Sequence, residues 1–167
     1  MKKDIIITQH ADLNTDCEII WTQCQLTGKK SKYILFGSHN RPNASDIKSL
    51  EELEASLLKI GDNIHKDNVI IAGDFNPPDI DWQNPDVSNR LVELIDNHDF
   101  SQLVHEPTRR QGETQNTLGL VLSNNKNIVR NVQVVPGISD HDIVLFTVNT
   151  TCKKKKNIER KIYFRKK

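Results

Sequence analysis

One run of the chain brings a carboxylate and an amide to the end of an apolar segment. Residues 69–72 are continuously apolar, as in a strand buried on both faces of a sheet, and they lead directly into Asp74 and Asn76. Residues two apart in extended backbone point to the same side, so both side chains can reach one phosphate. A carboxylate can hold Mg²⁺ and the attacking water while an amide donates to a phosphoryl oxygen. The alternative is plain turn chemistry, because Asp, Asn and Pro are common turn residues.

A second run places a histidine beside a carboxylate. Ser139, Asp140 and His141 come directly before the run 142–147, so they stand at the entrance of a predicted strand. Histidine exchanges protons near neutral pH, which suits a general base, and Asp140 can bind a metal or orient a ligand. An Asp-His pair in a loop is also a common surface feature. The presence of the first run favours a functional site.

The elements that must position these runs follow from hydrophobic periodicity. Apolar residues three and four apart predict a helix over 47–60, with Ser45 or Asp46 as N-cap and Gly61 at its end, and a second helix over 87–98. Strands are predicted at 18–24, 33–37, 69–72, 118–122, 132–135 and 143–147, the first two as an antiparallel pair around 28–31. Strands in runs, with helices between some of them, indicate an α/β (α+β) fold with a mixed pair of sheets covered by helices.

The length of the chain allows one hydrophobic core. No Gly/Ser-rich or Pro-rich linker divides the 167 residues, so we predict one domain over residues 1–150 and a basic tail or linker over 151–167. The net charge is only +1, whereas the tail carries Lys153–Lys156 and further cations around Tyr163 and Phe164. This segment can bind phosphates through counterion release, or it can be a solvated tail.

The remaining composition indicates an intracellular protein, nuclear or cytoplasmic. The amino-terminal residues lack the long apolar region and the cleavage site of a secretion signal, and no membrane-spanning run occurs. Cys17, Cys24 and Cys152 are odd in number and show no CxxC spacing. We therefore expect three reduced thiols rather than disulfides or a zinc site.

Several runs together resemble a known family. Residues 73–76 and 139–141 look like the two signature motifs of the endonuclease/exonuclease/phosphatase superfamily. Between and before them, residues 37–42, 106–109 and 116–124 resemble the endonuclease domain of non-LTR retrotransposons. The resemblance implies a DNase I-like fold, a two-sheet β-sandwich flanked by helices. It also implies an enzyme that nicks DNA and depends on Mg²⁺, or on Mn²⁺ in its place. The expected partners are DNA and, in the parent element, a reverse transcriptase domain; a membrane is not an expected partner.

The resemblance assigns expected roles to the matching residues. Asp74 and Asn76 would position the nucleophile and the phosphate, and Asp140 would belong to the metal site together with Asp74. His141 would contact the scissile phosphate or act as base. Hydrogen bonds or contacts to the substrate would come from three further residues, namely Ser139, Thr108 and Arg41, although an Arg before Pro is equally explained as a surface residue.

The chain also departs from the family pattern, and the departures predict weak activity. The match starts after the family's first strands, which carry an Asn and a metal-binding Glu, so we expect an amino-terminally truncated copy that is missing its first strands; Glu18 is a poor substitute. Gly119 stands where the family has the Asp that orients the histidine, and Asn40 stands where it has Tyr. Loss of a ligand weakens metal binding, and loss of the orienting carboxylate slows catalysis. We also expect low stability or association through unpaired strands.

Two other functions remain open at this point. The scaffold and the basic tail would also suit a non-catalytic module that binds nucleic acid or another partner. The superfamily further includes phosphatases of small phosphoesters such as inositol phosphates, although the retrotransposon-like runs favour DNA.

Overall fold

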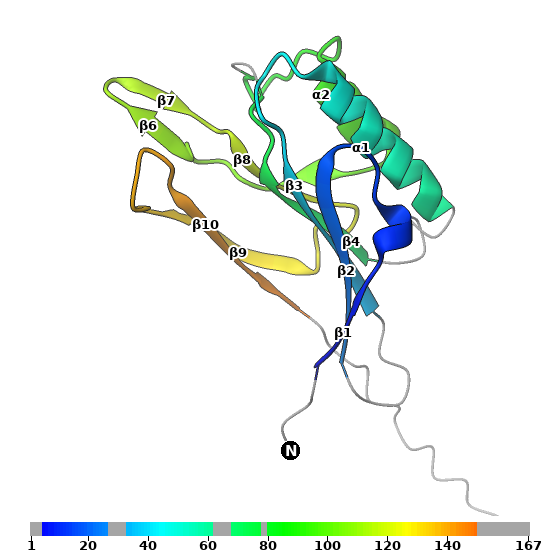
Figure 1. Cartoon of the computed structure of the whole chain (residues 1–167). Coiled ribbons are helices and arrows are strands. Elements are labelled where there is room, and N and C mark those ends of the chain that lie inside the picture. The colour runs from blue at the N-terminus through cyan, green and yellow to red at the C-terminus, as the bar shows by residue number, and fades with distance from the viewer. Residues whose placement is uncertain (1–4, 27–32, 62–67, 78–79, 150–167) are drawn as a thin grey trace, which may run out of the picture.

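The computed structural model describes residues 5–26, 33–61, 68–77 and 80–149. The predicted tail over 151–167, with Cys152, and the predicted turn at 28–31 lie outside these residues. A six-stranded sheet in the order β1-β2-β3-β4-β8-β5 forms the centre of the molecule (Figure 1). Its strands are β1 (Ile5–Gln9), β2 (Glu18–Leu26), β3 (Tyr33–Asn40), β4 (Asn68–Asp74), β8 (Gly119–Ser123) and β5 (Ser101–Gln102). All neighbours are antiparallel except β3 and β4, which run parallel.

One face of this sheet is covered by helices. The α-helix α1 (Ile47–Ile60) has the predicted bounds: the Asp46 side chain accepts from the Ser49 N–H, and Gly61, with φ of 57°, ends it. The second helix, α2 (Arg90–Asn97), is shorter than the predicted 87–98, because Asn89 caps it by accepting from the Leu91 N–H. The short 3-10 helix η1 (Ala11–Leu13) joins β1 and β2. None of the helices in the described ranges is long and apolar enough to span a membrane.

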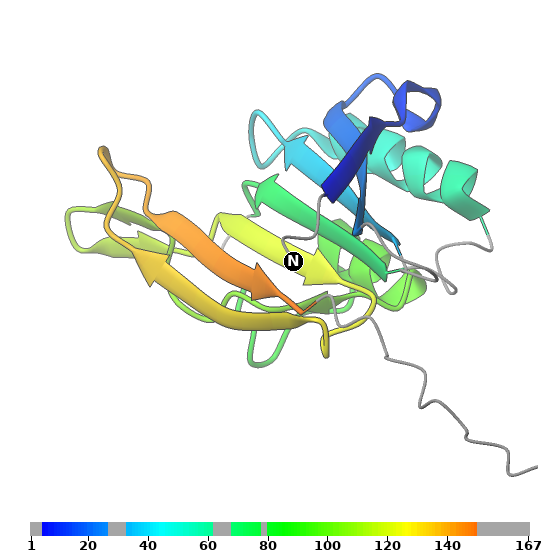
Figure 2. The same ribbon diagram turned by 90° about the horizontal axis from the view of Figure 1, so that it is seen from below.

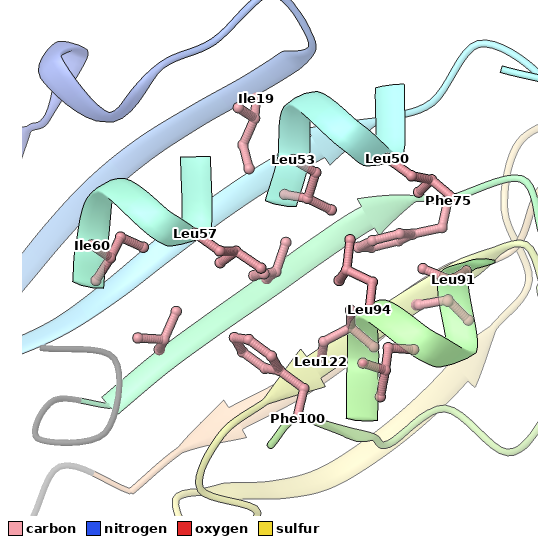
Figure 3. Packing of buried hydrophobic residues seen from close by; sticks show 14 of the residues in the cluster. Ile19, Leu50, Leu53, Leu57, Ile60, Phe75, Leu91, Leu94, Phe100 and Leu122 are labelled. Carbon is pink, nitrogen blue, oxygen red and sulfur yellow. The ribbon is translucent and has the colours of Figure 1, made fainter. Parts of the chain in front are cut away.

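The main hydrophobic core lies between the helices and the sheet (Figure 3). Leucine side chains of α1 and α2 pack onto the inward residues of β4 and β8, with Phe75 between the two helices. Trp21 is fully buried and donates from Nε1 to Ser56 Oγ at 2.6 Å. This hydrogen bond gives the buried indole N–H an acceptor and so offsets its loss of hydration. Strand β2 is therefore held to α1 by packing and by a polar contact.

A second, smaller sheet covers part of the opposite face. It consists, among the described residues, of the antiparallel strands β9 (Val129–Val135) and β10 (Ile143–Val148). Alternate residues of β10, namely Val144, Phe146 and Val148, pack with apolar residues of β3, β4 and β8. The fold is therefore a mixed α/β arrangement with two sheets and a helical layer, as the sequence predicted.

Two strands outside the main sheet had no counterpart in the sequence prediction. They are β6 (Arg109–Gln111) and β7 (Thr114–Asn116), which form a hairpin that projects from the body beside β9 and β10 (Figure 1). They are polar and three residues long, so they carry no apolar alternation that would reveal them. The strand β1 was also not predicted, because its Ile5, Ile6 and Ile7 show no alternation either.

Candidate functional site

The carboxyl end of β4 delivers Asp74 into a row of residues across the sheet. The strand registers place Glu18, Asn40, Asp74 and Gly119 side by side on β2, β3, β4 and β8. Glu18 Oε2 accepts a hydrogen bond from Asn40 Nδ2 at 2.6 Å. Directly opposite residues of paired strands point to the same side, so the row shares one face. This face carries the small sheet, because Asp74 and Gly119 line one space with Val144 and Phe146 of β10.

Asn76 and Arg41 tie the ends of β3 and β4 together. Asn76, at a φ of 41°, donates its backbone N–H to Asp74 Oδ1 at 3.1 Å, and its Nδ2 donates to the Arg41 carbonyl at 2.9 Å. The Arg41 N–H in turn donates to the Asp74 carbonyl at 2.8 Å. The Asn76 amide thus fixes the backbone around Asp74, whereas its predicted contact with a phosphate stays a prediction.

Arg41 is buried, although its position before a proline was equally explained by a place on the surface. Only 2% of it is exposed. Its guanidinium donates to the carbonyls of Asp46 at 3.0 Å, Phe75 at 3.3 Å and Asn76 at 3.5 Å, and also to that of Ala44. The surface explanation is therefore wrong. With these donors committed to backbone carbonyls, Arg41 holds the loops around the site, and substrate contact by Arg41 stays a prediction.

The segment that carries His141 is clamped by β6. Backbone hydrogen bonds join Arg110 N to the Asp140 carbonyl at 2.9 Å and Asp142 N to the Thr108 carbonyl at 2.7 Å, and Arg109 forms a bridge with His141. Two ion pairs lie beside them, Arg109 Nε to Asp140 Oδ2 at 2.9 Å and Arg110 Nε to Asp142 Oδ2 at 3.1 Å. The hydrogen bond from Arg109 lowers the pKa of Asp140 below its usual range.

Sequence reasoning missed these arginines. Arg109 belongs to the family-like run 106–109, from which only Thr108 was singled out. The available signal was charge, because Asp140 and Asp142 flank His141 and two arginines stand next to each other at 109 and 110. In the structure each arginine forms an ion pair with one of these carboxylates. Arg109 and Arg110 thus determine where the histidine segment lies.

A cleft of about 260 Å³ joins the two predicted runs. Asp74 and Gly119 line it from the main sheet, Thr108 lines it from the chain before β6, and His141 and Asp142 line it from the clamped segment. Asp74 and His141, far apart in sequence, therefore face one space. Asn76, Asp140 and Ser139 are not part of this lining; Ser139 is exposed, and its Oγ accepts from the His141 N–H at 3.4 Å.

Thr108 is part of the floor of this cleft. It is 1% exposed, and its Oγ1 accepts from the backbone N–H groups of Leu118 at 2.9 Å and Gly119 at 2.8 Å. The threonine was predicted to donate to a substrate. In the structure its oxygen acts as an acceptor that anchors the start of β8, and donation to a substrate stays a prediction.

The described residues do not form a complete metal site. No group of three or more His, Cys, Asp or Glu side chains in the described ranges lies close enough to share an ion. Asp140 is paired with Arg109, and Glu18 is two strands away from Asp74, which is roughly 10 Å at normal strand spacing. Two carboxylates line the cleft, but Asp142 is paired with Arg110, so Asp74 and Asp142 make a weak donor set for a divalent cation.

His39 lies behind the site and was also missed. It is 2% exposed, its ring packs against Phe75 at 4.9 Å between centroids, and neither ring nitrogen forms a hydrogen bond of normal geometry in the described structure. Burial, with a smaller contribution from the Arg41 charge, lowers the pKa of His39 to about 4. The neutral imidazole thus belongs to the core, and not to the cleft.

Gly73 allows β3 and β4 to approach beside this histidine. A Cβ at Gly73 would lie 1.8 Å from the His39 carbonyl oxygen, which no side chain could accept. The glycine before Asp74 is therefore required by close packing of the backbone.

Comparison with solved structures supports the same architecture. An endonuclease/exonuclease/phosphatase family protein from Leptotrichia buccalis C-1013-b matches with a TM-score of 0.55 and 14% identity, over 89% of this chain and 60% of that chain. TDP2 from D. rerio, complexed with a single-strand DNA product, matches with a TM-score of 0.50 and 13% identity, over 89% of this chain and 69% of that chain. The chain thus spans 60% of the length of the Leptotrichia protein. These likenesses establish the fold.

Comparison by sequence identifies the family. A comparison with curated proteins gives no match. A family model described as endonuclease-reverse transcriptase matches residues 31–145, which include β3, β4, β8 and the histidine segment. Because this model spans more than half of the chain and the fold agrees with it, the chain belongs to the endonuclease-reverse transcriptase family of the endonuclease/exonuclease/phosphatase superfamily.

Proposed function

We propose that this chain is a retrotransposon-derived phosphodiesterase domain that nicks DNA with Mg²⁺ or Mn²⁺, and that its activity is impaired. The observation that supports this most directly is the shared cleft, which both Asp74 from β4 and His141 from the segment beside β6 line. A carboxylate and an imidazole that line one cleft can act on the same phosphodiester. The family model, described as endonuclease-reverse transcriptase, supports a reverse transcriptase domain as a partner.

Each wall of the cleft supplies a different chemical group. The Asp74 carboxylate accepts a hydrogen bond from the Asn76 N–H, which orients it, and its other oxygen can accept a proton from an attacking water. His141 can donate a hydrogen bond to the phosphate or take up a proton, because an imidazole has both a donor and an acceptor nitrogen. A bound divalent cation would neutralise phosphate charge.

Two features support low activity. Gly119, which lines the same cleft, offers no carboxylate to hold the His141 imidazole in one orientation and tautomer. The incomplete set of metal ligands is the second feature, because affinity for a hard cation falls with the number of charged oxygen ligands.

A plasmid-nicking assay with Mg²⁺ tests the proposal. We expect slow nicking by the unmodified chain that His141→Ala and Asp74→Ala each abolish. Asp96→Asn, an exposed carboxylate on α2, is the matched control and should leave the rate unchanged. Nicking that survives both cleft substitutions would come from another source and would overturn the assignment of the site.

A non-catalytic nucleic-acid-binding module is the second candidate, and the incomplete metal site favours it. The two functions differ in metal dependence. A module would bind DNA equally well with Mg²⁺ and with EDTA, with an affinity that falls steeply with salt, and would show no nicking at any enzyme concentration. Nicking that requires the metal would exclude the module.

A further inference from the structure

Asp142 is a carboxylate in the cleft whose charge is balanced by Arg110. It lines the cleft together with Asp74 and His141, and its side chain is 13% exposed. Its Oδ2 lies 3.1 Å from Arg110 Nε, and its Oδ1 accepts a hydrogen bond from the Gly137 N–H at 3.3 Å. The carboxylate is thus held at the wall of the cleft by groups of the protein itself.

The backbone at Asp142 is fixed independently of this ion pair. Its N–H donates to the Thr108 carbonyl at 2.7 Å. Gly137 approaches the next turn so closely that a Cβ there would lie 1.9 Å from the His141 carbonyl oxygen. Figure 2 shows the green hairpin β6–β7 beside the turn that joins the yellow strand β9 to the orange strand β10. The carboxylate can therefore change its partner by rotation of the side chain, while the segment stays in place.

Arg110 can bind a phosphate in place of this carboxylate. Its side chain is 54% exposed, so a ligand at the mouth of the cleft can reach the guanidinium. A guanidinium offers several N–H donors in one plane, which suit a phosphate as well as a carboxylate. An ion pair with one partner so exposed contributes little net stability, because water solvates the separated charges well. Exchange of one anion for the other therefore costs little.

The neighbouring ion pair does not offer the same exchange. Arg109 binds Asp140, and Asp140 is not among the residues that line the cleft. Release of Asp140 would add no carboxylate to the lining, whereas release of Asp142 would give Asp74 a second carboxylate with an uncompensated charge in the same space. Two carboxylates attract a hard divalent cation more strongly than one.

We propose that Arg110 binds a phosphate of the DNA and that Asp142, released by this exchange, binds the divalent cation together with Asp74. This proposal rests on the proposed function for the identity of the polymer. It accounts for the incomplete metal site of the described residues, because one of the two carboxylates in the cleft is held by an arginine until a phosphate takes its place. Phosphate and cation then bind cooperatively, and each raises the affinity for the other by the same factor.

Binding of Mn²⁺ in the absence of DNA tests the release of Asp142. Arg110→Gln removes the cation that holds the carboxylate, so electron paramagnetic resonance of free Mn²⁺ should show binding at least about fivefold tighter than to the unmodified chain. Adding Asp142→Asn to this variant should abolish the gain. Arg109→Gln is the matched control, because it removes the same charge at the adjacent position. The proposal is overturned if Arg110→Gln gives no gain, or if Arg109→Gln gives an equal one.

DNA affinity in EDTA tests the other half of the exchange. Asp142→Asn frees Arg110, so fluorescence anisotropy of a short fluorescein-labelled duplex should show binding at least about fivefold tighter than to the unmodified chain. Asn keeps an oxygen that can accept from the Gly137 N–H, which retains the turn. In the Arg110→Gln chain the same substitution should give no such gain. An equal gain in both chains would mean that loss of charge repulsion alone is responsible, and would contradict the exchange.

These binding measurements are independent of the nicking assay. A chain that shows the exchange and does not nick would contradict the proposed activity and leave the exchange in place. A chain that nicks with Mg²⁺ but shows neither gain would contradict the exchange alone.

Discussion

Gly119 lies directly opposite Asp74 across the antiparallel β4–β8 pair, and both line the cleft together with His141. A Cβ at Gly119 would meet Thr108 Oγ1 at 3.4 Å and no closer atom, so a side chain fits there with little adjustment. The position therefore offers a direct way to place a carboxylate beside the histidine.

We predict that Gly119→Asp raises the nicking rate by about a hundredfold or more, because the new carboxylate can hold the imidazole in one orientation and tautomer. A plasmid-nicking assay with Mg²⁺ measures the effect. Gly119→Asn supplies similar bulk without charge, and an equal gain from Asn would show that electrostatics is not the cause.

Arg109 should control the ionisation of Asp140. Because a hydrogen bond from Arg109 lowers the pKa of this carboxyl, Arg109→Gln should raise that pKa toward its ordinary value. The stabilisation from this pair is present above the unfolded-state pKa and is lost as pH falls through the folded-state value. NMR titration of the carboxyl carbon tests the shift. Arg110→Gln, whose native partner is Asp142, should leave Asp140 unchanged; equal shifts in both variants would contradict the pairing.

His39 should make the folded state sensitive to mild acid. Its pKa is about 4 in the folded chain and 6.5 in its ordinary range, so the unfolded state binds a proton in this window and the folded state does not. Stability should therefore fall as pH drops from about 7 to 4, by up to about 3 kcal/mol from this residue. Urea unfolding across this range should show a smaller loss for His39→Gln. The exposed His105 is the control, and His105→Gln should keep the native pH dependence.

Arg41 should matter more for stability than for DNA affinity. Arg41→Met removes every hydrogen bond from the guanidinium to the loops at 44–46 and 75–76, including the buried one to the Phe75 carbonyl. We expect a loss of about 3 kcal/mol in the free energy of unfolding. Urea denaturation measures it, with Arg130→Met on the exposed side of β9 as a control. A stable Arg41→Met variant with weakened DNA binding would instead support a substrate contact.

The sequence predicted those parts of the site that short-range patterns define. A continuous apolar run that ends in Asp74 and a polar run before an apolar strand at His141 are both local signals, and each element formed where it was expected. Helix α1 was predicted with its bounds because its N-cap and its terminal glycine are adjacent to the periodic segment.

The parts that were missed depend on contacts between distant segments. Arg41 is buried only because the loops at 44–46 and 75–76 fold around it, and no residue beside it in sequence signals this. Residues Arg109 and Arg110 acquire their role from Asp140 and Asp142, thirty or so positions away, and the strands that carry them are polar. The low exposure of His39 likewise results from packing against Phe75.

The two walls of the cleft are built differently, and this sets how the site adapts to what it binds. Asp74 stands on the central sheet, whose strand ends are cross-tied through Arg41 and Asn76, so its position is fixed. His141 stands on a segment held by β6, through two backbone hydrogen bonds and two partly exposed ion pairs. When the cleft adapts its width to a bound ligand, the segment that carries His141 therefore moves and the strand end that carries Asp74 does not. Raised salt screens the two ion pairs, so it loosens the His141 segment first.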